Sequence, residues 1–320
     1  MELDPESWLD LVRREYLRDF VRDGGAAVKF IVARDQETRA GLREGLRHTA
    51  EEQGFQFAFV DAETTRIHMI DRLFHEVARQ IDWDALASAF VLRLLGEQGL
   101  DLPSDPRAIT LATIAERNDY PEAQLRTQID RSLSARLTRD YAMSQDFRFA
   151  MLELCRARLD PGADQTLRLA VLEWLRGELR LISALKRALI FQRVARHNAR
   201  HLLFSLAHWL KVAGRAGLVL VLDVARYADA ARPAARVGGN YYSTSAVLDA
   251  YEVLRQLIDA TDELEFCFVG VLAAPEMAQP SDDPRSMRKY NALWQRVADE
   301  VRDRHQPNPL ASLVRLEANP

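Results

Sequence analysis

The chain has few cysteines and none of the spacings that usually hold zinc. Cys155 and Cys267 are the only two in 320 residues, and both lie in apolar surroundings. No CxxC pair, HExxH motif or His/Cys cluster is present. We therefore expect two buried free thiols, a reducing compartment and no metal site.

The sequence also lacks any run of about 18 apolar residues, so we expect no membrane span. Its first residues are acidic and have no apolar core, so no signal peptide is expected and the location should be cytoplasmic. A hydrophobic content of 48% with 28% charged residues is typical of a globular protein. The net charge of −4 gives no global basic field, so nucleic acid could bind only at a local patch.

Strand and helix patterns alternate at both ends of the chain, which predicts a parallel sheet. The expected strands are 28–32, 55–60, 217–223, 264–272 and 312–316. The expected helices of this part are 7–22, 37–52, 67–81, 245–260 and 285–304. Between them, residues 83–213 show helical periodicity alone, enough for roughly six helices. We predict an α/β, P-loop NTPase-like core formed by 1–82 and 214–320, with 83–213 as a large all-helical insertion.

The segment Phe30–Ala40 lies where the phosphate-binding loop G-x-x-x-x-G-K-[ST] belongs, between a strand and a helix, but the residues of that loop are missing. Ala33 and Thr38 replace the two glycines. Arg39 replaces the lysine, and Ala40 replaces the Ser or Thr. The alternative is that this was never a phosphate loop and is only a surface turn.

Each replacement removes something that triphosphate binding uses. Glycine permits the positive φ and the close backbone approach of the cradle. A planar guanidinium is a poor substitute for the compact ammonium, and alanine has no hydroxyl for Mg²⁺. Asp35 and Glu37 add negative charge where phosphates would lie. We therefore expect no cofactor, neither ATP nor Mg²⁺, and no catalytic residue.

A second nucleotide motif is also incomplete. The apolar run Gly217–Asp223 predicts a buried parallel strand that ends in an aspartate. A hydrolytic P-loop enzyme pairs such an aspartate, which helps to hold Mg²⁺, with a glutamate that activates water. Here Val224 follows Asp223. We prefer to read Asp223 as a carboxylate that caps a turn or pairs with Arg39 rather than as a metal ligand.

Six segments carry a resemblance to a known family, namely Glu15–Phe30, Gly217–Asp223, Tyr241–Asp259, Ala274–Glu276, Tyr290–Leu293 and Asn308–Leu316. They resemble the ATP-binding P-loop proteins of bacterial BREX phage-defence systems. The resemblance implies an AAA+/STAND-like P-loop fold and partners such as DEAD/DEAH-type helicases and other defence components that act on DNA. The chain departs from the family at both nucleotide motifs, so we do not carry over its enzymatic role.

Two groups of arginines are further candidates for function. Arg285, Arg288 and Arg296 fall in the expected helix 285–304 and are candidate arginine fingers for a neighbouring subunit, or ordinary surface arginines.

Arg193, Arg196 and Arg200 are spaced so that one helix face would hold all three together with His197. Such a stripe would contact phosphates without reading sequence, or an acidic partner, or only solvent. Tyr241 and Tyr242 would be either a partner contact or a hydrophobic plug.

The leading hypothesis is a catalytically inactive P-loop ATPase paralogue, a pseudo-ATPase with degenerate nucleotide motifs. It would act as a structural or regulatory subunit of an anti-phage defence complex, alongside an ATP-competent paralogue or a helicase. One alternative is a sequence-independent DNA-binding module of the same system. The other is a divergent ATPase.

Overall fold

The computed structural model describes residues 4–105, 109–160, 162, 165–229, 239–298 and 308–316. The chain divides into two compact units. Unit 1 consists of residues 1–77 and 215–320, and unit 2 consists of residues 78–214. The domain limits expected from the sequence were 1–82 with 214–320, and 83–213.

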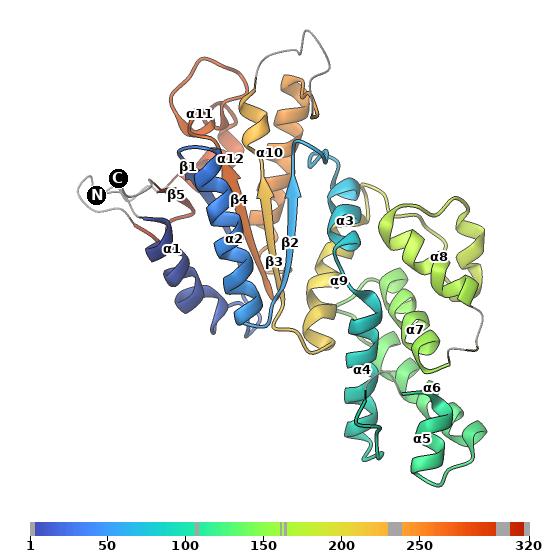
Figure 1. Ribbon diagram of the computed structural model, residues 1–320. Helices are drawn as coiled ribbons and strands as arrows, with labels where there is room; N and C mark the ends of the chain where they lie inside the picture. Colours follow the sequence, from blue (N-terminus) through green and yellow to red (C-terminus); the bar gives the residue numbers. More distant parts are fainter. Residues whose placement is uncertain are drawn as a thin grey trace. The chain divides into compact units, whose positions relative to one another are not determined.

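Unit 1 is built on a sheet of five parallel strands in the order β2-β3-β4-β1-β5 (Figure 1). The strands are β1 Ala26–Ala33, β2 Gln56–Asp61, β3 Leu218–Asp223, β4 Cys267–Ala273 and β5 Leu313–Leu316. The predicted parallel α/β architecture is therefore confirmed, and it is consistent with a P-loop-like fold. Each strand lies within three residues of its expected limits.

The central strands are largely apolar because helices cover both faces of the sheet; Lys29 in β1 and Asp223 at the end of β3 are the exceptions. Every residue of β4 is buried, as are the first five residues of β3. Figure 1 shows α2, Gln36–Glu52, on one face and α10, Thr244–Asp259, on the other. Leu42 and Leu46 of α2 are fully buried in the cluster that packs against the sheet. Burial of this kind contributes most of the favourable free energy of folding.

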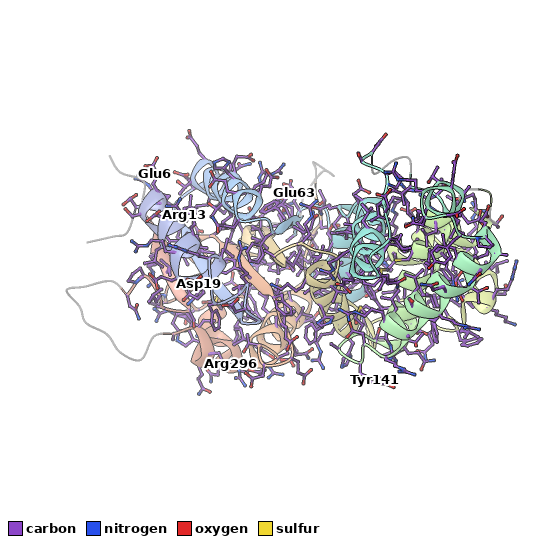
Figure 2. All side chains as sticks on the ribbon, turned by 90° about the horizontal axis from the view of Figure 1, so that it is seen from below. Glu6, Arg13, Asp19, Glu63, Tyr141 and Arg296 are labelled. Carbon is purple, nitrogen blue, oxygen red and sulfur yellow. The ribbon has the colours of Figure 1, made fainter. Side chains whose placement is uncertain are left out.

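The first helix differs from the expected span 7–22. It begins as α1, Pro5–Leu11, and continues as a π-helical segment η1, Val12–Leu17. The carboxylate of Asp4 accepts a hydrogen bond from the Ser7 amide at 2.9 Å and caps the first turn. Figure 2 shows the exposed charged side chains of this region projecting outward, among them Glu6, Arg13 and Asp19.

The expected helix 285–304 is wrong at its start. The structure has a short α11, Pro275–Ala278, one turn of 3-10 helix η5, Met287–Lys289, and then α12, Asn291–Val297. The Arg285 amide donates to the Asp283 side chain, which holds this position in a turn instead of a helix. Residues 299–304 of the expected helix lie outside the described residues. The expected helix 67–81 is shorter too, since α3 spans Ile70–Arg79.

Unit 2 contains helices and no strand in its described residues. In chain order the elements are α4 Trp83–Glu97, α5 Leu111–Arg117, α6 Glu122–Thr138, α7 Gln145–Leu159, α8 Gln165–Arg176, the 3-10 helix η3 Ile182–Ala188 and α9 Ala199–Val212. Aromatic side chains fill its core, with ring contacts of Trp83 to Phe147 and of Phe90 to Trp209. Tyr141, in contrast, projects into solvent (Figure 2).

The two cysteines, Cys155 in α7 and Cys267 in β4, are free and buried, as predicted. Burial raises the pKa of both thiols, so neither is a reactive thiolate at neutral pH. In the part of the chain that is described, none of the helices combines the length and apolar character needed to cross a bilayer.

Candidate functional site

The turn between β1 and α2 follows the carboxyl end of β1, and parallel α/β folds bind ligands at the carboxyl ends of their strands. From β1 the chain crosses to β2 on one side of the sheet, whereas from β4, the neighbour of β1, it leads to β5 on the other side. Diverging connections at the carboxyl ends of adjacent strands leave a crevice, and ligands bind there in this class of fold. The predicted position of the degenerate loop is therefore the position at which a nucleotide would be sought.

This turn is short. Strand β1 ends at Ala33 and α2 begins at Gln36, so only Arg34 and Asp35 connect them. The P-loop template places four residues between its two glycines, and here two of those four positions, Gln36 and Glu37, are already helical. Ala33 is fully buried and pairs with β5 as a strand residue, so it takes no part in a turn. The described backbone forms a tight strand-to-helix turn and no wide loop.

The N-terminus of α2 is capped by the protein itself. Asp35 is the N-cap, and its Oδ1 accepts hydrogen bonds from the amide and the hydroxyl of Thr38, each at 2.8 Å. These two hydrogen bonds hold the pKa of the Asp35 carboxyl below its usual range. Free amides at a helix N-terminus are what an anion binds, and here a carboxylate already occupies one of them.

The pocket beside this turn is acidic, although the exposed Arg34 lies in the turn itself. A pocket of about 360 Å³ is lined by Asp35, Glu37 and Thr38 together with Pro5, Gly41 and Leu42. Its two ionisable side chains are both carboxylates, so a phosphate group placed here would meet like charge. Ala40, at the position of the Mg²⁺-binding hydroxyl, is exposed and carries no polar side-chain atom.

Arg39 and Asp223 come together across the edge of the sheet. Arg39 Nε lies 3.4 Å from Asp223 Oδ2, and the two side chains are only 15% and 17% exposed. The other carboxylate oxygen of Asp223 accepts a hydrogen bond from the Ala225 amide at 2.9 Å. The prediction that Asp223 caps a turn or pairs with Arg39 is thus confirmed in both parts. Arg39, which stands at the position of the P-loop lysine, and Asp223, the strand-end aspartate that would help to hold Mg²⁺, therefore neutralise each other.

The ionisation of Asp223 reflects its position between unlike neighbours. Burial raises the pKa of its carboxyl above the ordinary value, and the nearby Asp61 raises it further, while the Ala225 amide and Arg39 oppose this. Asp61 ends β2 and lies opposite Asp223 in the strand register. Asp61 was not among the site residues expected from the sequence. Two predicted strands that each end in an aspartate could have indicated that the two carboxylates lie near each other.

Val224 carries no chemistry at the position of the catalytic glutamate. Its side chain is fully buried, and its amide donates to the Leu272 carbonyl at 2.9 Å. Among the described residues, no group of three or more His, Cys, Asp or Glu side chains is placed to hold a metal ion.

The two tyrosines of the loop before α10 play different parts. Tyr242 is 3% exposed, and its hydroxyl lies within hydrogen-bond distance of the carbonyl oxygens of Ala62 and Thr65, just after β2. It is a plug, one of the two readings left open by the sequence. Tyr241 is 41% exposed and is available to a partner.

The common helix expected for Arg193, Arg196 and Arg200 is wrong. Residues 190–195 have no regular structure, Arg196 lies in a turn, and α9 begins only at Ala199. Asn198 sets this boundary, because its side chain accepts from the Ala195 amide and donates to the Arg193 carbonyl. The three arginines therefore do not form a helical stripe, and their contact with nucleic acid or a partner stays a prediction.

The three candidate arginine fingers contact other groups of unit 1. Arg285 forms an ion pair with Asp283 at 2.8 Å, and Arg296 forms one with Asp259 of α10. Arg288 donates to a backbone carbonyl of α11 at 2.9 Å and lies over a tryptophan ring of α12. To serve a neighbouring subunit, each would first have to leave these partners, so the finger role stays a prediction.

Comparison with known protein families matches most of the chain. The family described as BREX system ATP-binding protein BrxC/D matches residues 14–318. No curated protein and no solved structure matches the chain. The match includes both nucleotide-motif positions and almost the whole of the chain.

Proposed function

Because the chain belongs to the BREX system ATP-binding family BrxC/D, we propose that it is a catalytically inactive P-loop ATPase paralogue within that family. Membership implies a role in a phage-defence system. We assign the chain a structural or regulatory part in a defence complex, built on an AAA+/STAND-like core that no longer turns over ATP.

One observation carries this proposal. The connection between β1 and α2 has two residues, and the carboxylate of Asp35 takes the Thr38 amide that a phosphate oxygen would need. A triphosphate would have to displace that carboxylate, open the turn and overcome the charge of Glu37. Each of these steps opposes binding, and no free lysine ammonium or hydroxyl is offered in return by the residues described at this turn. The family is described as ATP-binding, and we propose that this chain has lost that property through these residues.

The ion pair between Arg39 and Asp223 supports the same conclusion. In an active enzyme the positive group at this position would contact phosphate, and the strand-end aspartate would help to hold Mg²⁺. Here their separation is 3.4 Å and both are largely buried, so each is the partner of the other. The sheet of the fold is intact, whereas the charged groups at the nucleotide position pair with each other. This combination suits a subunit that acts by contacting other macromolecules.

The partners we propose are an ATP-competent paralogue, a DEAD/DEAH-type helicase of the same system, or both. Paralogues of one fold can share a subunit interface, so an inactive copy can hold its place in an assembly whose active copies hydrolyse ATP. Neither partner requires this chain to bind nucleotide.

Isothermal titration calorimetry of the intact chain with ATP and Mg²⁺ tests the proposal. We expect no heat of binding up to millimolar nucleotide and no phosphate release above a buffer blank. A micromolar dissociation constant, or hydrolysis that exceeds the blank, would contradict the proposal and favour the divergent-ATPase alternative. The variant Asp35→Asn is a useful companion, because it removes the carboxylate charge and keeps a capping side chain. Binding by this variant alone would identify Asp35 as the group that excludes phosphate.

The DNA-binding alternative loses its strongest argument with the expected basic helix. It is still testable by a salt-dependent gel shift with duplex and single-stranded DNA. Binding that disappears in the triple variant R193A/R196A/R200A would restore it, and binding that is unchanged would remove that site.

A further inference from the structure

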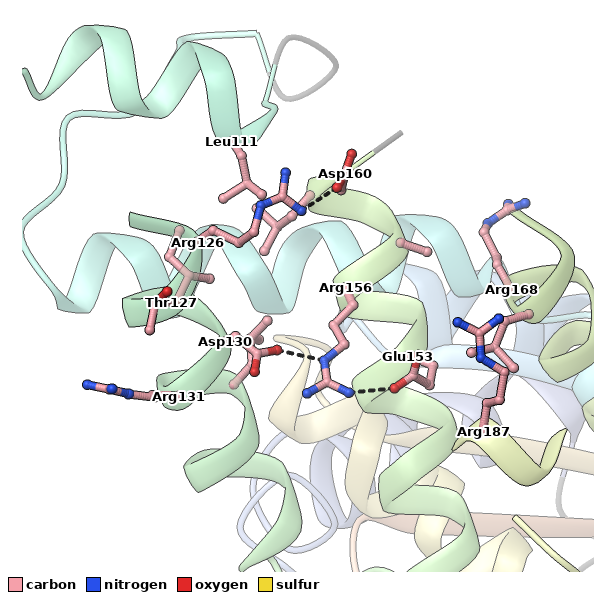
Figure 3. Close-up of a pocket in the computed structure, with 15 residues that line it drawn as sticks. Leu111, Arg126, Thr127, Asp130, Arg131, Glu153, Arg156, Asp160, Arg168 and Arg187 are labelled. Carbon is pink, nitrogen blue, oxygen red and sulfur yellow. Dashed lines mark hydrogen bonds and ion pairs between the residues drawn. The ribbon is translucent and has the colours of Figure 1, made fainter. Parts of the chain in front are cut away.

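A pocket of about 610 Å³ in unit 2 is lined by arginines from four elements (Figure 3). Arg126 and Arg131 come from α6, Arg156 from α7, Arg168 from α8 and Arg187 from η3. Only three carboxylates join them in the lining, so the ionisable side chains around the pocket carry a formal charge of +2. This local excess occurs in a chain whose net charge is −4.

Ion pairs order the middle of the pocket. Arg156 reaches Glu153 at 2.6 Å and Asp130 at 2.7 Å, which joins α7 to α6. Arg126 pairs with Asp160 at the C-terminal end of α7. Figure 3 shows these pairs side by side. They fix the separation of the helices, so the pocket is preorganised and a ligand would have little ordering to do.

Exposed arginines lie on the rim of the pocket. Arg168 is paired with Asp84, whereas Arg131 makes no ion pair or hydrogen bond with any residue that the structure describes. Arg131 and Arg187 are both exposed and come from different elements. A partner carboxylate on the rim would meet positive charge from more than one wall of the pocket.

The remaining lining is aliphatic apart from Thr127. Leu111, Ile129, Leu133 and Leu159 are each at least 95% buried, and Leu167 is partly exposed. No aromatic ring is among the described lining residues, so a nucleobase would find no stacking platform. An aliphatic floor with a basic rim fits an apolar side chain flanked by carboxylates.

We propose that this pocket docks an acidic segment of a protein partner, with an aliphatic side chain inserted among the leucines and carboxylates on Arg131 and Arg187. The inference deepens the proposed subunit role and rests on it, since it names where and by what chemistry one partner is held. The aliphatic floor selects this occupant over DNA, because the described lining offers no aromatic ring on which a base could stack.

The chain around Arg187 supports a protein contact. Leu181, Leu189 and Phe191 flank or follow η3 and are 69%, 50% and 58% exposed. Large apolar side chains gathered on one short segment are typical of a surface that a partner covers. When an acidic segment of the partner occupies the pocket, the partner residues next to that segment could contact Leu181, Leu189 and Phe191.

The test is selection of a phage-displayed random-peptide library on the intact protein, with the double variant R131E/R187E as counter-selection. The matched control is Arg136→Glu, which reverses an exposed arginine of α6 outside the pocket. Selected peptides are then synthesised with a fluorescent label, and their affinities are measured by fluorescence anisotropy. Circular dichroism checks that each variant is folded.

We expect the enriched peptides to be acidic with at least one aliphatic residue. Reversal of both rim arginines should weaken their binding about tenfold or more, while Arg136→Glu should leave it unchanged. Three outcomes would overturn the proposal: no peptide whose binding depends on Arg131 and Arg187, enriched peptides without acidic residues, or displacement by a DNA oligonucleotide or by inorganic phosphate. None of them bears on ATP binding at the β1–α2 turn, so failure here is separable from failure of the proposed function.

Discussion

Replacing Arg39 by alanine should destabilise unit 1 by leaving the Asp223 carboxylate without its counter-charge. Asp223 is 17% exposed in its side chain, and Asp61 lies close enough to raise its pKa. Removing one partner of a fully buried ion pair costs about 3–5 kcal/mol. Because both side chains keep some exposure and Ala225 still donates to Asp223, we expect a loss of about 2 kcal/mol in the free energy of unfolding.

A double-mutant cycle isolates the pair. Asp223→Asn removes the charge and keeps an acceptor for the Ala225 amide, so it should lower the free energy of unfolding by less than R39A does. The double variant should lower it by less than the sum of the two single variants, with a coupling of about 1 kcal/mol. Arg34→Ala, which truncates an exposed arginine of the same turn, is the matched control. The R39A loss should shrink as the pH falls, because protonation of Asp223 removes the unpaired charge.

The assay is urea unfolding followed by circular dichroism, with hydrogen-exchange mass spectrometry on peptides from β3 to report on unit 1 itself. If R39A unfolds with a free energy within about 0.5 kcal/mol of the parent and the cycle is additive, the ion pair does not stabilise the protein and our interpretation of this edge is wrong.

Three further predictions concern other charged groups. Burial lowers the pKa of Lys29 from 10.5 to about 8, so the folded state disfavours its ammonium, and the free energy of unfolding should rise between pH 8 and 10.5 by roughly 3 kcal/mol. Urea unfolding midpoints measured across this pH range should show the rise in the parent protein and not in Lys29→Met. Hydrogen bonds from Arg255 and Tyr290 lower the pKa of Glu252 to about 2, so its contribution, complete above pH 4.5, should fade as the pH drops toward 2, and Glu252→Gln should show a flatter acid unfolding curve. Asp35→Ala should speed amide exchange in the first turn of α2, whereas Asp35→Asn should leave it nearly unchanged.

The sheet could be predicted from the sequence because its strands are buried on both faces. Runs such as Leu218–Asp223 have no polar residue until their last position, and that pattern is typical of a strand covered by helices on both sides. The turn after β1 was also placed correctly, since the strand and the helix around it are both regular. The connection is two residues shorter than the expected 33–36, because Ala33 still pairs as a strand residue and Gln36 already begins α2.

The prediction from helical spacing was wrong at a place where side-chain capping determines where the helix begins. Arg193, Arg196 and Arg200 have the spacing of one helix face, but the Asn198 side chain binds the preceding backbone and starts α9 one residue later. Asparagine is a common residue at helix boundaries, so Asn198 did indicate a boundary in the sequence. The regular spacing of the arginines was given more weight in the prediction.

Other features depend on contacts between distant residues and leave no local trace. Lys29 donates to the carbonyl oxygens of Leu310 and Ala311, about 280 residues away, and lies over the ring of Tyr16. A lysine in the middle of an apolar strand is visible in the sequence, but its acceptors are not. The pocket of unit 2 is similar, because its arginines come from four separate helical elements.

The most direct test of the central claim is a crystal of the protein soaked with a non-hydrolysable ATP analogue and Mg²⁺. Our account predicts no triphosphate density at residues 33–40, with Asp35 still bonded to Thr38 and Arg39 still beside Asp223. Clear density for a triphosphate held by the backbone amides of this turn would contradict it.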